Sequence, residues 1–88
     1  MAAISVGLGG DGDEVAAIEA VEREFQVWLN GDDAANWRTA SDVYTSLLKA
    51  LPVEARAEPR NWQRFAAALA SETGIDPNRI EPDSPLLA

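Results

Sequence analysis

The sequence predicts an all-α protein, a small bundle of three to four helices. Alanine, the strongest helix former, occupies 16 of the 88 positions. No segment of useful length alternates apolar and polar residues, as a half-buried strand would. Apolar residues instead recur at helical spacing in three segments separated by stretches that carry Pro or Gly. Because the chain is long enough for one domain and no more, we expect residues 1–88 to form a single unit.

The first helix is predicted over residues 13–29. Asp11 and Asp13 are candidate N-caps, since a short polar side chain accepts hydrogen bonds from the first helical amides. Asn30 and Gly31 are expected to end the helix, because either residue tolerates the left-handed cap conformation. Six apolar residues recur at helical spacing and should form its buried stripe: Val15, Ile18, Val21, Phe25, Trp28 and Leu29.

The second helix follows a short helical turn predicted at residues 32–37. Thr39 is its expected N-cap, and Asp42 three residues on completes a variant of the capping box. Pro52 should end the helix. Trp37, in the loop before the cap, is expected to plug one end of the bundle. The predicted inner side of this helix holds Val43, Tyr44, Leu47, Leu48 and Leu51.

The third helix is predicted to begin at Pro59, a position that tolerates proline, and to end near Gly74. Its inner face should hold Trp62, Phe65, Ala66, Leu69 and Thr73. Residues 52–58 and 75–88 are predicted loops, the second pinned to the core by Ile75, Ile80, Leu86 and Leu87. Three Trp and two Phe are expected to fill the centre, each buried large side chain contributing about 1.5–3 kcal/mol.

Composition excludes several classes of function. The chain has no Cys and no His, which excludes a Cys/His zinc site, a Ser-His-Asp triad and a disulfide scaffold. The net charge of −8 argues against nucleic-acid binding, which requires Lys and Arg to neutralise phosphates. No apolar run approaches the roughly 20 residues that span a bilayer, and no signal peptide is visible. We therefore expect a soluble, cytoplasmic monomer with no membrane span.

The negative charge is concentrated at one end of the sequence. Residues 1–36 hold eight acids and one base, residues 37–58 hold three of each, and the remainder adds −1. Two interpretations stay open: a solvated helix face, or an acidic surface that attracts a basic partner protein. Ala16, Ala20 and Val27, predicted to point away from the core, favour contact. The candidate interaction residues are Asp11, Asp13, Glu14, Glu19, Glu22 and Glu24.

Residues 9–14 suggest a different hypothesis, a metal or phosphate site. Only Asp11, Asp13 and Glu14 fit a calcium loop, which needs ligands over a dozen positions and a closing Glu. A phosphate loop requires a Lys-Ser/Thr pair after the glycines, and none is present. The many carboxylates lack a predicted cleft in which to act as acid and base. We expect no enzyme, no metal and no cofactor.

Two segments resemble parts of the acyl carrier protein family. Residues 15–51 are similar to the second half of such a protein, matching at residues 21–25, 32–34 and 39–43. Residues 62–86 resemble its opening part: a first helix, then Gly74-Ile75-Asp76-Pro77 and a loop leading toward the prosthetic-group site. The order is swapped, which implies a circularly permuted carrier fold. Such permutation is feasible because the termini of small domains often lie close together.

The family carries phosphopantetheine on the serine of an Asp-Ser-Leu motif, and the equivalent position here is occupied by Asp11, counted back from Phe25. A carboxylate cannot be esterified in this way. The resemblance therefore implies a carrier-like interaction module without a prosthetic group, whose partner is the basic surface of an acyl-transfer or other biosynthetic enzyme. The alternative is a functional acyl or peptidyl carrier modified on Ser84, although its position in the upstream loop favours structural capping. Ser5 is a weaker candidate.

Overall fold

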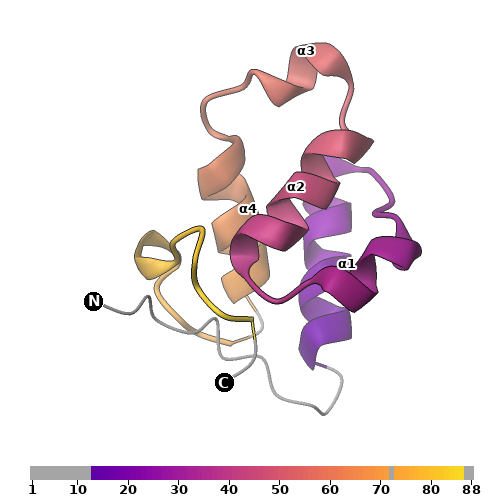
Figure 1. The fold of residues 1–88 in the computed structure, drawn as a ribbon. Helices are drawn as coiled ribbons and strands as arrows, with labels where there is room; N and C mark the ends of the chain where they lie inside the picture. Colours follow the sequence, from indigo (N-terminus) through magenta and orange to yellow (C-terminus); the bar gives the residue numbers. More distant parts are fainter. Residues whose placement is uncertain (1–12, 72, 87–88) are drawn as a thin grey trace.

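The computed structural model of this chain describes residues 13–71 and 73–86, and it is all-α, as predicted. Within these residues the only β pairing is an isolated bridge between Thr39 and Pro85. The elements are α1 (Asp13–Phe25), η1 (Gly31–Asn36), α2 (Ala40–Ala50), α3 (Val53–Arg56), α4 (Asn61–Ala70) and η2 (Pro77–Arg79), where η is a 3₁₀ helix. Figure 1 shows α3 at one end of the bundle, joining α2 to α4.

α1 ends at Phe25, and the predicted end at residue 29 is wrong. Gln26 takes the left-handed conformation with a φ of 57° and stops the helix. Asn30 was expected with Gly31 to end α1, but its side chain instead begins the next turn. Its Oδ1 accepts the Asp32 N–H at 2.9 Å and caps η1. The predicted turn at residues 32–37 is confirmed, shifted by one residue.

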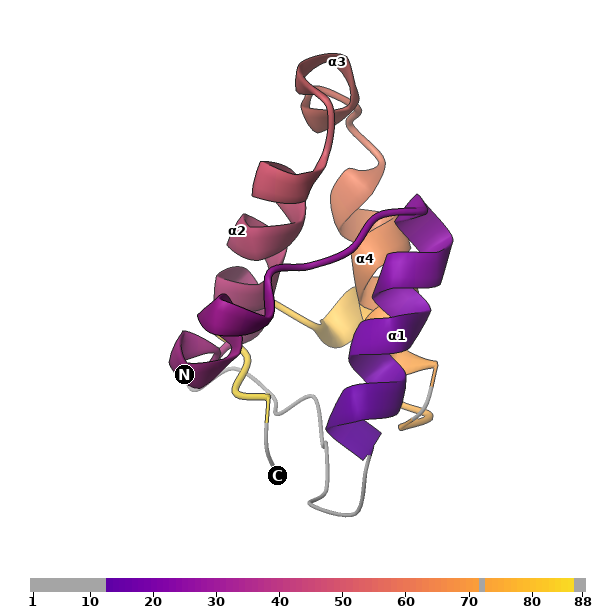
Figure 2. The same ribbon diagram turned by 90° about the vertical axis from the view of Figure 1, so that its right-hand side faces the viewer.

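The predicted stripe of α1 is confirmed in part: Val21 and Leu29 are buried, and Ile18 and Phe25 pack against the core. Ala17, Ala20 and Val21 are buried, so the expectation that Ala20 points outward is wrong. Val15 is 56% exposed and Trp28 85% exposed, although both were assigned to the buried stripe. α1 packs along α4, and α4 lies between α1 and α2 in Figure 2. Of the six predicted stripe residues, Val15 and Trp28 therefore lie outside the core.

α2 matches its prediction closely. Thr39 Oγ1 accepts the Asp42 N–H at 3.4 Å, and the Asp42 carboxylate accepts the Thr39 N–H at 3.1 Å, which completes the capping box. The helix stops before Pro52. Its buried residues are Ala40, Val43, Ser46 and Leu47, with Leu51 buried just beyond and Tyr44 and Leu48 half-buried.

The connection to the third long helix differs from the expected loop. Residues 52–58 include the single turn α3, and α4 begins at Asn61, so Pro59 lies before the helix instead of in its first turn. Asn61 is buried, and its Nδ2 donates to the Ala55 carbonyl at 2.7 Å. Gly74 follows α4 with a φ of 74°, and its N–H donates to the Ala70 carbonyl at 3.0 Å.

The aromatic centre is smaller than predicted. Phe65 is fully buried, while Tyr44, Trp62 and Phe25 are half-buried. Tyr44 lies 4.9 Å from the Trp62 ring centre, edge-on, and 5.2 Å from that of Phe65, so these rings join α2 to α4. Trp37 is also half-buried. The expectation that all three Trp fill the centre is wrong, because Trp28 lies outside it.

The C-terminal segment is pinned to the core, as expected. Ile80 and Leu86 are buried and Ile75 is half-buried, while Leu87 lies outside the described residues. The segment is also hydrogen-bonded to the start of α2: the Ala40 N–H donates to the Ser84 carbonyl at 2.9 Å. The Leu86 N–H donates to the Arg38 carbonyl at 3.0 Å. Residues 84–86 and residues 38–40, which are far apart in the sequence, are thus joined beside the N-terminus of α2.

Candidate protein-interaction surface

The predicted acidic residues have different environments in the structure. Asp11 lies outside the described residues, and Asp13 and Glu14 open α1. Glu19 is exposed, whereas Glu22 and Glu24 both form contacts within the fold. Of the three predicted acids whose side chains the structure describes, Glu19 is exposed, while Glu22 and Glu24 support the fold.

Glu24 ties the end of α1 to α4. The Arg64 Nε lies 2.9 Å from Glu24 Oε2, and Arg64 Nη2 donates to the Glu24 carbonyl at 3.0 Å. The same guanidinium stacks over the Phe25 ring, 4.4 Å from its centre. Because both side chains of the ion pair are partly exposed, the pair contributes little stability by itself. Its main effect is to orient the helix end.

Glu22 fixes the turn that leaves α1. Its carbonyl accepts the Val27 N–H at 3.1 Å, the bond expected in a helix end that closes through a left-handed residue, here Gln26. Its carboxylate accepts the Leu29 N–H at 2.9 Å. One residue therefore holds the backbone on both sides of Trp28.

Trp28 belongs to the candidate site, although the sequence pattern assigns it to the core. It stands 85% exposed between the half-buried Val27 and the buried Leu29. Helical periodicity assigned it to the core only because the helix was extended to residue 29. The early stop at Gln26 reverses its direction, and a left-handed Gln is not signalled strongly by sequence.

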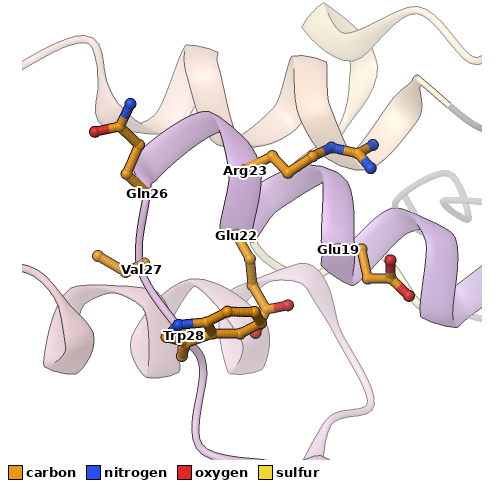
Figure 3. Close-up of a pocket in the computed structure, with 6 residues that line it drawn as sticks. All are labelled: Glu19, Glu22, Arg23, Gln26, Val27 and Trp28. Carbon is orange, nitrogen blue, oxygen red and sulfur yellow. The ribbon is translucent and has the colours of Figure 1, made fainter.

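An open groove of about 450 Å³ lies beside this turn. Its lining residues are Glu19, Glu22, Arg23, Gln26, Val27 and Trp28. In Figure 3 the Glu22 side chain reaches toward the Trp28 indole, while Arg23 extends away from it along the far edge of α1. The groove thus combines a large apolar ring with carboxylates on the same side, which suits a cation attached to an apolar group.

A second polar cluster joins η1 to α2. The Trp37 Nε1 donates to Ser46 Oγ, and Ser46 Oγ donates to Asp33 Oδ2, each at 2.9 Å. Lys49 Nζ lies 2.9 Å from the same Asp33 oxygen and, together with Ser46, lowers the pKa of Asp33. Ser46 is buried and both of its hydrogen-bonding roles are used inside the fold. The cluster has a structural explanation and offers no exposed nucleophile.

Ser84 is fully buried and caps the turn that precedes it. Its Oγ accepts the Glu81 N–H at 2.9 Å, and its own N–H donates to the Glu81 carbonyl at 2.9 Å. This is the capping role anticipated from sequence. A modifying enzyme would have to open this segment to reach the hydroxyl.

Residues 13–71 and 73–86 contain no cluster of three acidic side chains placed to hold a metal ion. No helix in this part of the chain has the length and apolar character to cross a membrane. Most of residues 9–14, the segment of the calcium hypothesis, lies outside the described residues. No family model, curated protein or solved structure matches this chain.

Proposed function

We propose that this protein is a non-enzymatic, acyl carrier protein-like module that acts without a prosthetic group and docks on the basic surface of a partner protein. The observation that carries the proposal is the exposed apolar and acidic surface of α1 and its exit turn, residues 26–29. This segment exposes Val15 and Trp28, and residues 1–36 hold eight acids against one base. Exposed apolar side chains surrounded by negative charges are typical of a surface that docks a positively charged partner.

The exposed apolar residues follow one line on the molecule. Val15, Glu19 and Glu22 recur at intervals of four and three, so they share one face of α1. Trp28 continues that line beyond the helix end, in the groove that Glu19 and Glu22 also line. Of the three large exposed apolar side chains in the described residues, two lie on this segment and the third, Val53, lies on α3.

Two observations support the absence of a phosphopantetheine arm. An acid, Asp11, occupies the position where the resemblance places the modified serine. The alternative serine, Ser84, has a buried hydroxyl that is already hydrogen-bonded. The carrier-like frame is supported by the packing of α1 along α4 and by the bonds between the C-terminal segment and α2, since a permuted order requires both.

Intact-mass measurement tests the proposal. The full chain is incubated with coenzyme A and a broad-specificity phosphopantetheinyl transferase, beside an ordinary acyl carrier protein as a positive control. We expect the control to gain the arm and this chain to keep its bare mass. A gained phosphopantetheine, located on Ser84 by fragmentation, would establish the alternative carrier function instead.

A further inference from the structure

The groove beside Trp28 has the shape and charge to bind one cationic and one apolar side chain together. Given the proposed function, on which this inference rests, we infer that the groove takes a partner segment presenting an arginine next to an apolar side chain. The guanidinium lies on the Trp28 indole and pairs with Glu19, and the apolar neighbour covers Val27. The partner is a protein segment with a single cation at this point, in contrast to a uniformly basic tract.

Trp28 is held in place before any partner arrives. The Val27 N–H bond to the Glu22 carbonyl and the Leu29 N–H bond to the Glu22 carboxylate fix the backbone on either side of it. The buried Leu29 anchors the turn further. Because the backbone that carries Trp28 is already fixed, binding does not have to order this turn, and tryptophan dominates the energetics of many interfaces. Trp37 and Trp62 are half-buried, so neither offers a comparable surface.

The charges around the groove select a cation. Glu19 is exposed, and Glu22 uses one carboxylate oxygen for the Leu29 N–H while its charge remains beside the indole. A planar guanidinium stacks on an aromatic face and forms paired hydrogen bonds with a carboxylate, which an ammonium does less well. Arg23 on the far edge of the groove repels further cations, and this limits the contact to a single arginine.

A second copy of the chain is the competing occupant, and charge disfavours it. Pairing two such grooves would bring together two segments that each carry eight acids and one base. Such like-charge contact is unfavourable unless salt screens it. A basic partner instead gains attraction from the same field.

Calorimetric titration of the full chain with a designed peptide tests the inference. The probe is a short synthetic peptide with one arginine flanked by leucines, and its twin carries citrulline, which keeps the shape and removes the charge. We expect Trp28→Ala to weaken binding at least about tenfold. Glu19→Gln and the citrulline twin should each weaken it about threefold.

Two matched variants serve as controls. Val53→Ala removes an exposed apolar side chain from α3, and Glu54→Gln removes one charge from the same helix. Neither should change the affinity. Because Trp28 is exposed, Trp28→Ala should keep the wild-type circular dichroism spectrum and thermal midpoint, so a loss of binding reports on contact and not on unfolding.

Other outcomes overturn the inference. These are equal binding by Trp28→Ala, equal binding of the citrulline twin, and no binding of the arginine peptide. Concentration-dependent dimerisation that Trp28→Ala abolishes would assign the groove to a second copy. If Trp28→Ala binds normally while added salt and Glu19→Gln weaken binding, this inference fails and the acidic docking surface stands. A phosphopantetheine mass on the chain would instead overturn the proposed function and leave the peptide result unaffected.

Discussion

α1 and α2 are amphipathic helices of similar length that use their apolar residues in different ways. α2 begins with a complete capping box, ends before Pro52 and places its large apolar side chains in or against the core. α1 packs along α4, leaves Val15 exposed, and passes into a turn in which Trp28 is exposed. The difference is that α2 uses its large apolar side chains in the core, whereas α1 and the turn after it leave two exposed.

Charge follows the same division. Residues 37–58, which include α2, hold equal numbers of acids and bases, while residues 1–36 hold eight acids and one base. A helix selected only for stability gains nothing from such self-repulsion. The segment that exposes apolar side chains is therefore also the segment with the excess of negative charge. These two features together define the proposed docking surface.

The largest expected contrast is in core truncation. Leu47→Ala in α2 removes a fully buried side chain and should lower the free energy of unfolding by about 2–5 kcal/mol. Val15→Ala in α1 removes a side chain that is 56% exposed and should change it by no more than about 0.5 kcal/mol. Urea denaturation of both variants measures the difference. Similar losses at the two sites would show that α1 buries its apolar residues as α2 does.

A smaller effect is expected at the end of α1. Gln26→Gly should raise the free energy of unfolding by about 0.5–1 kcal/mol, because the left-handed conformation strains a residue with a Cβ. Gln63→Gly is the matched control within α4, where the same change should destabilise by about 1 kcal/mol. Denaturant titration of both variants measures whether each change raises or lowers the free energy of unfolding. Destabilisation by Gln26→Gly would contradict the strained turn that presents Trp28.

The smallest effect should come from acid titration of the α2 cap. The Arg38 and Thr39 N–H groups lower the pKa of Asp42 below 3.8. A carboxyl whose folded pKa is depressed stabilises the protein above its unfolded pKa, and this stability is lost as the pH falls through the folded value. Stability should therefore decline below about pH 3.8, and less steeply in Asp42→Asn. Thermal midpoints measured across this range would count against the cap if both proteins declined in parallel.

The sequence predicted the elements whose limits are set by neighbouring residues. Thr39 and Asp42 specify the start of α2 by local hydrogen bonds, and Pro52 forbids its continuation. The capping role of Ser84 was likewise predicted, from its place in the loop that the family resemblance assigns upstream of the prosthetic-group site. In each case the determining contacts lie within a few positions along the chain.

The errors arose where the outcome depends on packing between distant segments. Ala20 is buried and Val15 is exposed, an outcome that depends on how α1 packs along α4 and that periodicity within α1 cannot reveal. Glu22 was predicted as a surface acid, yet its carboxylate accepts the Leu29 N–H in the turn that follows the early stop at Gln26. That early stop moved Trp28 from the expected core to the candidate site. Of the predicted interaction residues whose side chains the structure describes, Glu19 and Glu22 line the groove, and Glu22 is already hydrogen-bonded to the Leu29 N–H.

The central claim is that α1 and its exit turn form the binding surface while α2 serves the fold. Amide chemical shifts of the labelled chain, followed during titration with the arginine-leucine peptide, test it most directly. We predict saturable shifts at residues 15–28 and at the Trp28 indole N–H, diminished by salt, with residues 40–50 unmoved. Shifts centred on α2, or an unmoved Trp28 indole at saturation, would contradict the claim.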